Sequence, residues 1–150
     1  MTQLSQIETL MEELGPVLDP VSIEAFPKDR HWIVILDEET VCFLDFDEEQ
    51  NKLIFRCPLG DPARDRLSLY ETLLVYNGLW TQESGCWMGL EEGMVVQLYE
   101  DDADVFDVPR LTHVLQKFRD IARDWSKIVT SPTASTASLP HQSDTDNIMG

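Results

Sequence analysis

The sequence predicts an α+β domain in which three helices accompany an antiparallel sheet, in the order α-β-β-β-α-β-β-α. Two observations lead to this fold class. Five short apolar runs, rich in β-branched and aromatic residues, form a group of three and a group of two, and only a few acidic or glycine-containing residues separate the runs within each group. Such spacing favours antiparallel strands joined by tight turns. Three longer segments instead repeat their apolar residues at helical spacing.

The first helix is predicted over residues 2–14, where Gly15-Pro16 is a typical stop signal. Its apolar face consists of Leu4, Ile7, Leu10 or Met11, and Leu14. The connection 16–30 holds three prolines and is predicted to be irregular. Within it, Val21–Phe26 can form a short extended piece.

The group of three strands is predicted to form a meander between His31 and Gly60. Its runs are Trp32–Leu36, Val41–Phe46 and Leu53–Cys57. Apolar residues occupy both sides of these runs, because Trp32 and Val34 alternate with other apolar residues. An antiparallel sheet normally buries one face and leaves the other in water. The second apolar face is therefore expected to meet another chain.

A second helix is predicted over residues 63–79, with Asp61 as its cap and Pro62 in its first turn. Its apolar residues extend most of the way around the helix, which indicates burial on more than one side. The simplest second partner in a domain of this size is another copy of the chain.

The remaining elements are a hairpin, a third helix and a tail. The hairpin joins Cys86–Leu90 to Met94–Tyr99 through a turn of two acidic residues and a glycine. The helix is predicted from about Asp107 to Val129. The last stretch is rich in Ser, Thr and Pro and is expected to be disordered. The predicted organisation is one domain over 1–129 and a tail over 130–150.

Charge excludes several classes of partner. The chain has a net charge of −17 and a pI near 4.2, which excludes nucleic acid and anionic membranes, since both are bound through Lys and Arg. Residues 107–129 carry five basic and three acidic side chains, so the acidic field belongs to residues 1–106. No signal peptide and no stretch long enough for membrane insertion is evident, so a cytoplasmic location is expected.

The sequence contains no catalytic, metal or cofactor motif. Asp45, Asp47 and Glu49 alternate as in a calcium loop, but Gln50 and Arg56 replace the glycine and the last ligand, so an acidic turn is the better interpretation. The three histidines are scattered, and neither a nucleophile motif nor a phosphate-binding glycine loop is present. The three cysteines are expected to be reduced, partly buried thiols. We therefore expect no enzyme activity and no cofactor.

Residues 2–129 resemble the class I chaperones of bacterial type III secretion. The resemblance lies in the ELG end of the first helix, the strand pair VCFLDFDEE and KLIFRCPLG, and the helix end LLVYNGLW. The hairpin WMGLEEGMVVQLYE and the closing helix LTHVLQKFRDIARDW complete it. The size, the acidity and the order of the elements agree with this family as well.

The resemblance implies a homodimer with a twisted antiparallel sheet, located in the bacterial cytoplasm. It also implies that the N-terminal segment of a secreted effector wraps around the dimer in extended form, with no cofactor. The dimer interface implied for this chain comprises the second helix and the hairpin, with candidates Leu67, Tyr70, Leu74, Trp87 and Met94.

Effector-contacting candidates follow from outward-facing positions on the first helix and the meander, although periodicity leaves open which sheet face meets the client. The candidates are Leu4, Ile7, Met11, Trp32, Val34, Val41, Phe43, Leu53 and Phe55. The alternative function is an acidic adaptor that sequesters a basic regulatory protein through its charged surface. Salt would weaken such a contact strongly and an apolar contact much less.

Overall fold

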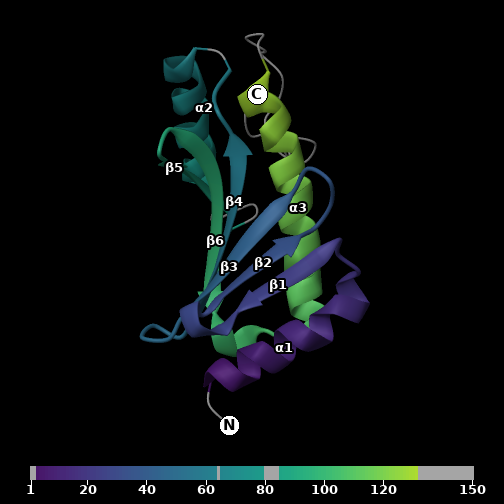
Figure 1. The fold of residues 1–150 in the computed structure, drawn as a ribbon. Coiled ribbons are helices and arrows are strands. Elements are labelled where there is room, and N and C mark those ends of the chain that lie inside the picture. The colour runs from purple at the N-terminus through teal and green to yellow at the C-terminus, as the bar shows by residue number, and fades with distance from the viewer. Residues whose placement is uncertain (1–2, 64, 80–84, 132–150) are drawn as a thin grey trace.

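A computed structural model describes residues 3–63, 65–79 and 85–131 (Figure 1). Short 3₁₀ turns lie at Pro27–Asp29 and Ala103–Val105. The helices and strands, in chain order, are α1 (Gln3–Leu18), β1 (Ser22–Phe26), β2 (His31–Ile35), β3 (Val41–Asp47), β4 (Lys52–Gly60), α2 (Arg66–Leu79), β5 (Trp87–Glu91), β6 (Met94–Asp102) and α3 (Val108–Thr130).

The strands form one twisted, six-stranded antiparallel sheet in the order β1-β2-β3-β4-β6-β5 (Figure 1). The predicted α+β class, meander and hairpin are confirmed. The extended piece expected near Val21–Phe26 is a full strand, β1, so the element order contains one strand more than predicted. This strand forms the edge of the sheet next to β2.

The core lies between one face of the sheet and the helices α1 and α3, and we call this face the inner face. Figure 1 shows α3 running along the sheet, with α1 crossing near one end of α3 and α2 standing beside β5 at the other. Trp32, Leu44 and Phe55 are buried on the inner face. α2 joins this core through Tyr76, whose ring lies 5.0 Å from that of Trp125 on α3.

The first helix is longer than predicted, because Gly15 and Pro16 do not end it. A proline disfavours helical geometry in the preceding residue by clashes with the N–H and the Cβ of that residue, and Gly15, which has no Cβ, avoids one of these clashes. The helix instead ends where Asp19 adopts a left-handed conformation, with φ of 53°. The Asp19 N–H donates to the Gly15 carbonyl at 2.9 Å and satisfies one of the last helical acceptors.

The helix starts follow local capping chemistry. The start of α2 was predicted at Ala63 with an Asp61 cap, but the helix begins at Arg66, where the Asp65 carboxylate accepts from the Leu67 N–H. The start of α3 is confirmed, because Asp107 accepts from the Arg110 N–H at 2.8 Å.

The three cysteines are free and buried. None of the described helices has both the length and the hydrophobicity needed to cross a membrane. The tail predicted over 130–150 lies almost entirely outside the described residues, although Thr130 still belongs to α3.

Candidate functional site

A groove of about 440 Å³ lies between α1 and the edge strand β1. It is lined mainly by apolar groups and bordered by two carboxylates. Its lining from α1 comprises Glu8, Met11, Glu12 and Gly15, and its lining from the strand side includes Ile23, Ala25 and Trp32. Ile23 and Ala25 point into it because they pair with Val34 and Trp32, whose side chains face inward.

The edge of β1 adjoins this groove. β1 pairs with β2 alone among the described strands, so its other edge presents backbone N–H and C=O groups that no described strand satisfies. The strand is five residues long and lies between Pro20 and Pro27. Short length and flanking prolines limit uncontrolled edge pairing, yet leave room for one added segment.

The outer face of the sheet carries a second apolar surface, which we call the outer patch. Its members are partly buried and come from β2, β3 and β4: Ile33, Ile35, Val41, Phe43 and Ile54. The strand register places Ile33 opposite Phe43 and Ile35 opposite Val41. Phe26, which is 42% exposed, continues this surface onto β1 through the ring of His31.

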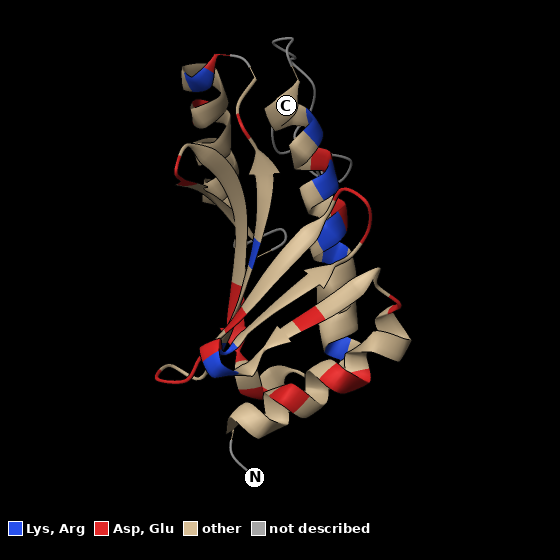
Figure 2. Cartoon of the chain, viewed as in Figure 1, with Lys and Arg blue, Asp and Glu red and all other residues tan. Residues whose placement is uncertain are grey.

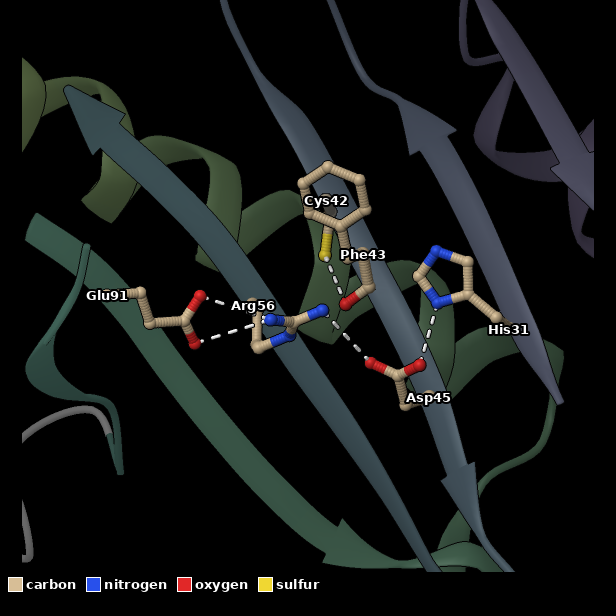
Figure 3. A network of polar contacts seen from close by, with 6 residues as sticks. All are labelled: His31, Cys42, Phe43, Asp45, Arg56 and Glu91. Atoms are coloured by element: carbon tan, nitrogen blue, oxygen red, sulfur yellow. Dashed lines mark hydrogen bonds and ion pairs between the residues drawn. The ribbon is translucent and has the colours of Figure 1, made fainter. Parts of the chain in front are cut away.

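A polar network crosses the outer face beside this patch (Figure 3). His31 Nδ1 lies 2.7 Å from Asp45 Oδ1, and the Arg56 guanidinium lies 3.5 Å from the other Asp45 oxygen. Arg56 also reaches Glu91 on β5 at 3.1 Å. These partly exposed pairs add little stability individually, but they hold Arg56 in place, with its guanidinium carbon 5.7 Å from the centre of the Phe43 ring.

Taken together, the groove, the free strand edge and the outer patch form a surface suited to an extended peptide. Within the part of the chain that the structure describes, no group of three or more His, Cys, Asp or Glu residues is arranged to hold a metal ion.

Comparison with known protein families decides the relationship. The model of the Tir chaperone protein (CesT) family matches residues 9–126, which include the whole sheet and every groove-lining residue except Glu8. The chain belongs to the Tir chaperone protein family. No curated protein sequence matches the chain.

Solved structures share the fold of this Tir chaperone family member. A chain of the ExsC–ExsE complex superposes with a TM-score of 0.78 at 18% identity, covering 90% of this chain and 100% of that chain. A chain of the HopA1–SchA chaperone–effector complex superposes with a TM-score of 0.68 at 18% identity, covering 81% of this chain and 93% of that chain. A chain of the Yersinia pestis type III secretion chaperone SycH in complex with a fragment of YscM2 superposes with a TM-score of 0.60 at 22% identity. The match covers 81% of this chain and 98% of that chain.

The strand positions predicted to contact an effector divide between the two faces of this family member's sheet. Val41 and Phe43 lie on the outer patch. The expectation that the other four strand positions face outward is wrong, because they are at most 1% exposed in the core; these are Trp32, Val34, Leu53 and Phe55. The error arises at both turns of the meander, because the register pairs Val34 with Cys42 and Phe55 with Leu44, on the face opposite Val41 and Phe43.

The predicted contacts from α1 are also turned toward the core. Ile7 is 2% exposed and Met11 is 3% exposed, and the partly buried Leu4 packs against the same cluster. Met11 nevertheless borders the groove. A contact with a client therefore remains a prediction for Met11 and Trp32, which border the groove, and for Val41 and Phe43 on the outer patch.

The sequence interpretation missed part of the groove lining and three of the five residues of the outer patch. The missed residues are Ile23 and Ala25 on β1, and Ile33, Ile35 and Ile54 on the outer face. The signal for the outer patch was present in the alternate positions of the same apolar runs. The groove had a weaker signal, because β1 lies among three prolines.

The predicted dimer candidates lie on α2 and the β5–β6 hairpin. Leu67 and Leu74 are 68% and 69% exposed, and Met94 is 37% exposed. Tyr70 and Trp87 are partly buried, and Tyr70 packs against the core. Two further exposed residues, Val75 and Leu90, were not among the candidates. The role of these residues in an interface remains a prediction.

Proposed function

We propose that this protein is a cytoplasmic bacterial chaperone that binds the N-terminal segment of a type III secreted effector. The observation that carries this proposal is the free edge of β1 beside the groove formed with α1. Membership of the Tir chaperone protein family supports it. Two structures that share this fold are a HopA1–SchA chaperone–effector complex and the type III secretion chaperone SycH in complex with a fragment of YscM2.

The proposed mechanism is capture of the client as an added strand. Backbone groups of the client pair with β1, while its alternate side chains enter the groove on one face and meet the outer patch on the other. Ordering such a segment costs roughly 2–5 kcal/mol or more, so many apolar contacts are required. The bound segment stays extended and its apolar residues stay covered until secretion, without catalysis by the chaperone.

We further propose that the chaperone is a homodimer through α2 and the β5–β6 hairpin. Leu67 and Leu74 lie two turns apart on one side of α2 and are largely exposed in the single chain. A twofold interface would bring the same apolar side chains of two copies together.

The experiment that tests client binding uses a groove variant. Full-length protein and a candidate secreted protein from the same genome are co-expressed, and the chaperone is recovered by affinity tag. Ala25→Trp, which fills the groove from an exposed position, should abolish co-purification of the client. Val105→Trp, at an exposed site that is not part of the groove lining, is the matched control and should leave it unchanged. Equal recovery with both variants would contradict binding in the groove.

The alternative, an acidic adaptor for a basic regulatory protein, gives a different result in salt. A complex held by the charged surface should dissociate as NaCl rises from 0.1 M to 1 M. A client held in the groove and on the outer patch should remain bound over the same range.

A further inference from the structure

Two carboxylates of α1 border the groove without a compensating cation. Glu8 and Glu12 both line it and are separated by one helical turn. Neither forms an ion pair with any residue that the structure describes. Like charges at this spacing destabilise a helix, so the pair stands beside the groove at a cost to the free protein.

A third carboxylate lies on the other side of the same strand edge. Glu24 is exposed in the middle of β1 and pairs in register with Ile33, so its side chain belongs to the outer face. A segment added to β1 would therefore meet apolar surface on both faces and a carboxylate beside each. Figure 2 shows acidic residues on α1 and on β1, whereas most basic residues in view lie along α3.

No basic side chain that the structure describes lines the groove, and six of them pair with carboxylates elsewhere. Arg30 pairs with Glu48, and Arg56 pairs with Asp45 and Glu91. Close to the groove, Lys28 follows Pro27, but it does not line the groove and has Asp29 as its neighbour. The groove thus keeps its negative charge in the folded chain.

We propose that the groove selects an extended client segment whose apolar residues are flanked by Lys or Arg side chains, which lie against Glu8 and Glu12. This inference rests on the proposed function and specifies the chemistry of its client. The Lys or Arg side chains of the client are attracted to the carboxylates of Glu8 and Glu12, and they also reduce the repulsion between these two carboxylates. Acidic segments are rejected by the same pair.

The rejection extends to the chain's own C-terminal stretch. Residues 130–150 contain Asp144 and Asp146 but no Lys or Arg. The charge of the groove therefore disfavours occupation by this stretch and leaves the site for a basic segment of another protein.

The test is selection of a random dodecapeptide library on the full-length protein. Peptides enriched on the wild type should carry Lys or Arg beside an apolar run. Selection on Glu8→Gln/Glu12→Gln should lose the bias, and selection on Glu8→Lys/Glu12→Lys should shift it to Asp and Glu. Glu38→Gln/Glu49→Gln removes the same net charge from two exposed turn positions and should keep the wild-type bias.

Affinity for one enriched basic peptide gives the magnitude. By fluorescence anisotropy, Glu8→Gln/Glu12→Gln should weaken binding about three- to tenfold, as expected for two partly exposed ion pairs, while the Glu38/Glu49 control changes it less than about twofold. An equal loss in the control would assign the preference to the overall charge and overturn the proposal.

The two proposals fail differently. Peptides enriched on the wild type could show no preference for Lys or Arg and fail to bind Ala25→Trp. This result would overturn the proposed preference for basic segments and leave binding in the groove intact. Enrichment that is the same on wild type and Ala25→Trp would contradict both, because the groove would then bind no peptide.

Discussion

The Arg123 guanidinium on α3 donates a 2.6 Å hydrogen bond to the carboxylate of Asp37, in the turn between β2 and β3. Burial tends to raise the pKa of Asp37, but hydrogen bonds from the Glu39 N–H and from the Arg123 and Thr40 side chains outweigh it. The net result is a pKa below the ordinary value of 3.8. This contact fastens the turn of the meander to the helix that covers its inner face.

Asp37→Asn should destabilise the fold in a pH-dependent manner. A carboxyl whose pKa is lower in the folded state stabilises the protein above the unfolded-state pKa, and this contribution is lost as pH falls through the folded-state value. The variant should therefore unfold at lower urea concentration than wild type at pH 7, and the difference should shrink below about pH 4. Glu38→Gln, exposed in the same turn, is the control. Equal midpoints of Asp37→Asn and wild type at pH 7 would show that the contact contributes nothing.

Phe55 and Phe43 should respond very differently to truncation. Phe55 is fully buried and contacts the rings of Tyr99, Phe106 and Phe118, so Phe55→Ala should cost about 3–5 kcal/mol in the free energy of unfolding. Phe43→Ala on the outer patch should cost less than half as much. Urea denaturation measures both changes.

Phe43→Asp then separates function from folding. The variant should remain folded and dimeric and lose client capture, because a charge replaces an apolar contact on the outer patch. If Phe43→Asp unfolds the protein, the outer patch is part of the core and cannot serve as a docking surface.

Gly60→Ala should destabilise the end of β4. Gly60 has φ of 110°, which L residues rarely adopt, and an added Cβ would lie 2.9 Å from the Thr130 methyl group of α3. Strain and clash together should cost about 1–3 kcal/mol in thermal or urea unfolding. Gly93→Ala, at φ of 85° in open space, isolates the backbone strain.

Thr130→Ser provides the matched rescue for this substitution. It removes the methyl group and keeps the hydroxyl, which donates to the Ser126 carbonyl at 2.7 Å. Gly60→Ala should lower the free energy of unfolding more than Gly93→Ala does, and the double variant Gly60→Ala/Thr130→Ser should recover this difference. If the double variant is no more stable than Gly60→Ala, the whole loss of stability comes from backbone strain at Gly60.

The proposed dimer predicts a mass of about twice 17.2 kDa by light scattering at micromolar concentration. Leu74→Asp should give a single-chain mass, because each copy loses about 1.5–3 kcal/mol of apolar burial and gains a buried charge. Val105→Asp, at an exposed site away from α2, should remain dimeric. A single-chain mass for the wild type would refute the dimer.

Much of the fold could be predicted because its signals are local. The apolar period of α3, the Asp107 cap and the Glu92–Gly93 turn, with φ of 52° and 85°, each specify their structure within a few residues. Helix α1 differs at Gly15-Pro16, where the missing Cβ of Gly15 removes part of the clash by which Pro16 disfavours a helix.

The binding surface was harder to predict because it depends on register and on chain neighbours distant in sequence. Alternation within a strand identifies two faces but not which of them meets α3. That choice follows from pairings such as Val34 with Cys42 across the turn. The groove requires α1 to lie beside β1, a tertiary contact that no local pattern encodes.

In the proposed complex, the five-residue length of β1 also sets how firmly the client is held. Each backbone hydrogen bond contributes only about 0.5–1.5 kcal/mol net, and prolines on both sides prevent the ladder from lengthening. Backbone pairing thus provides alignment, while the lifetime of a complex is set by the side chains that anchor in the groove and on the outer patch. A client can consequently be removed by peeling one end at a time, with each anchor released separately, and unloading needs no unfolding of the chaperone.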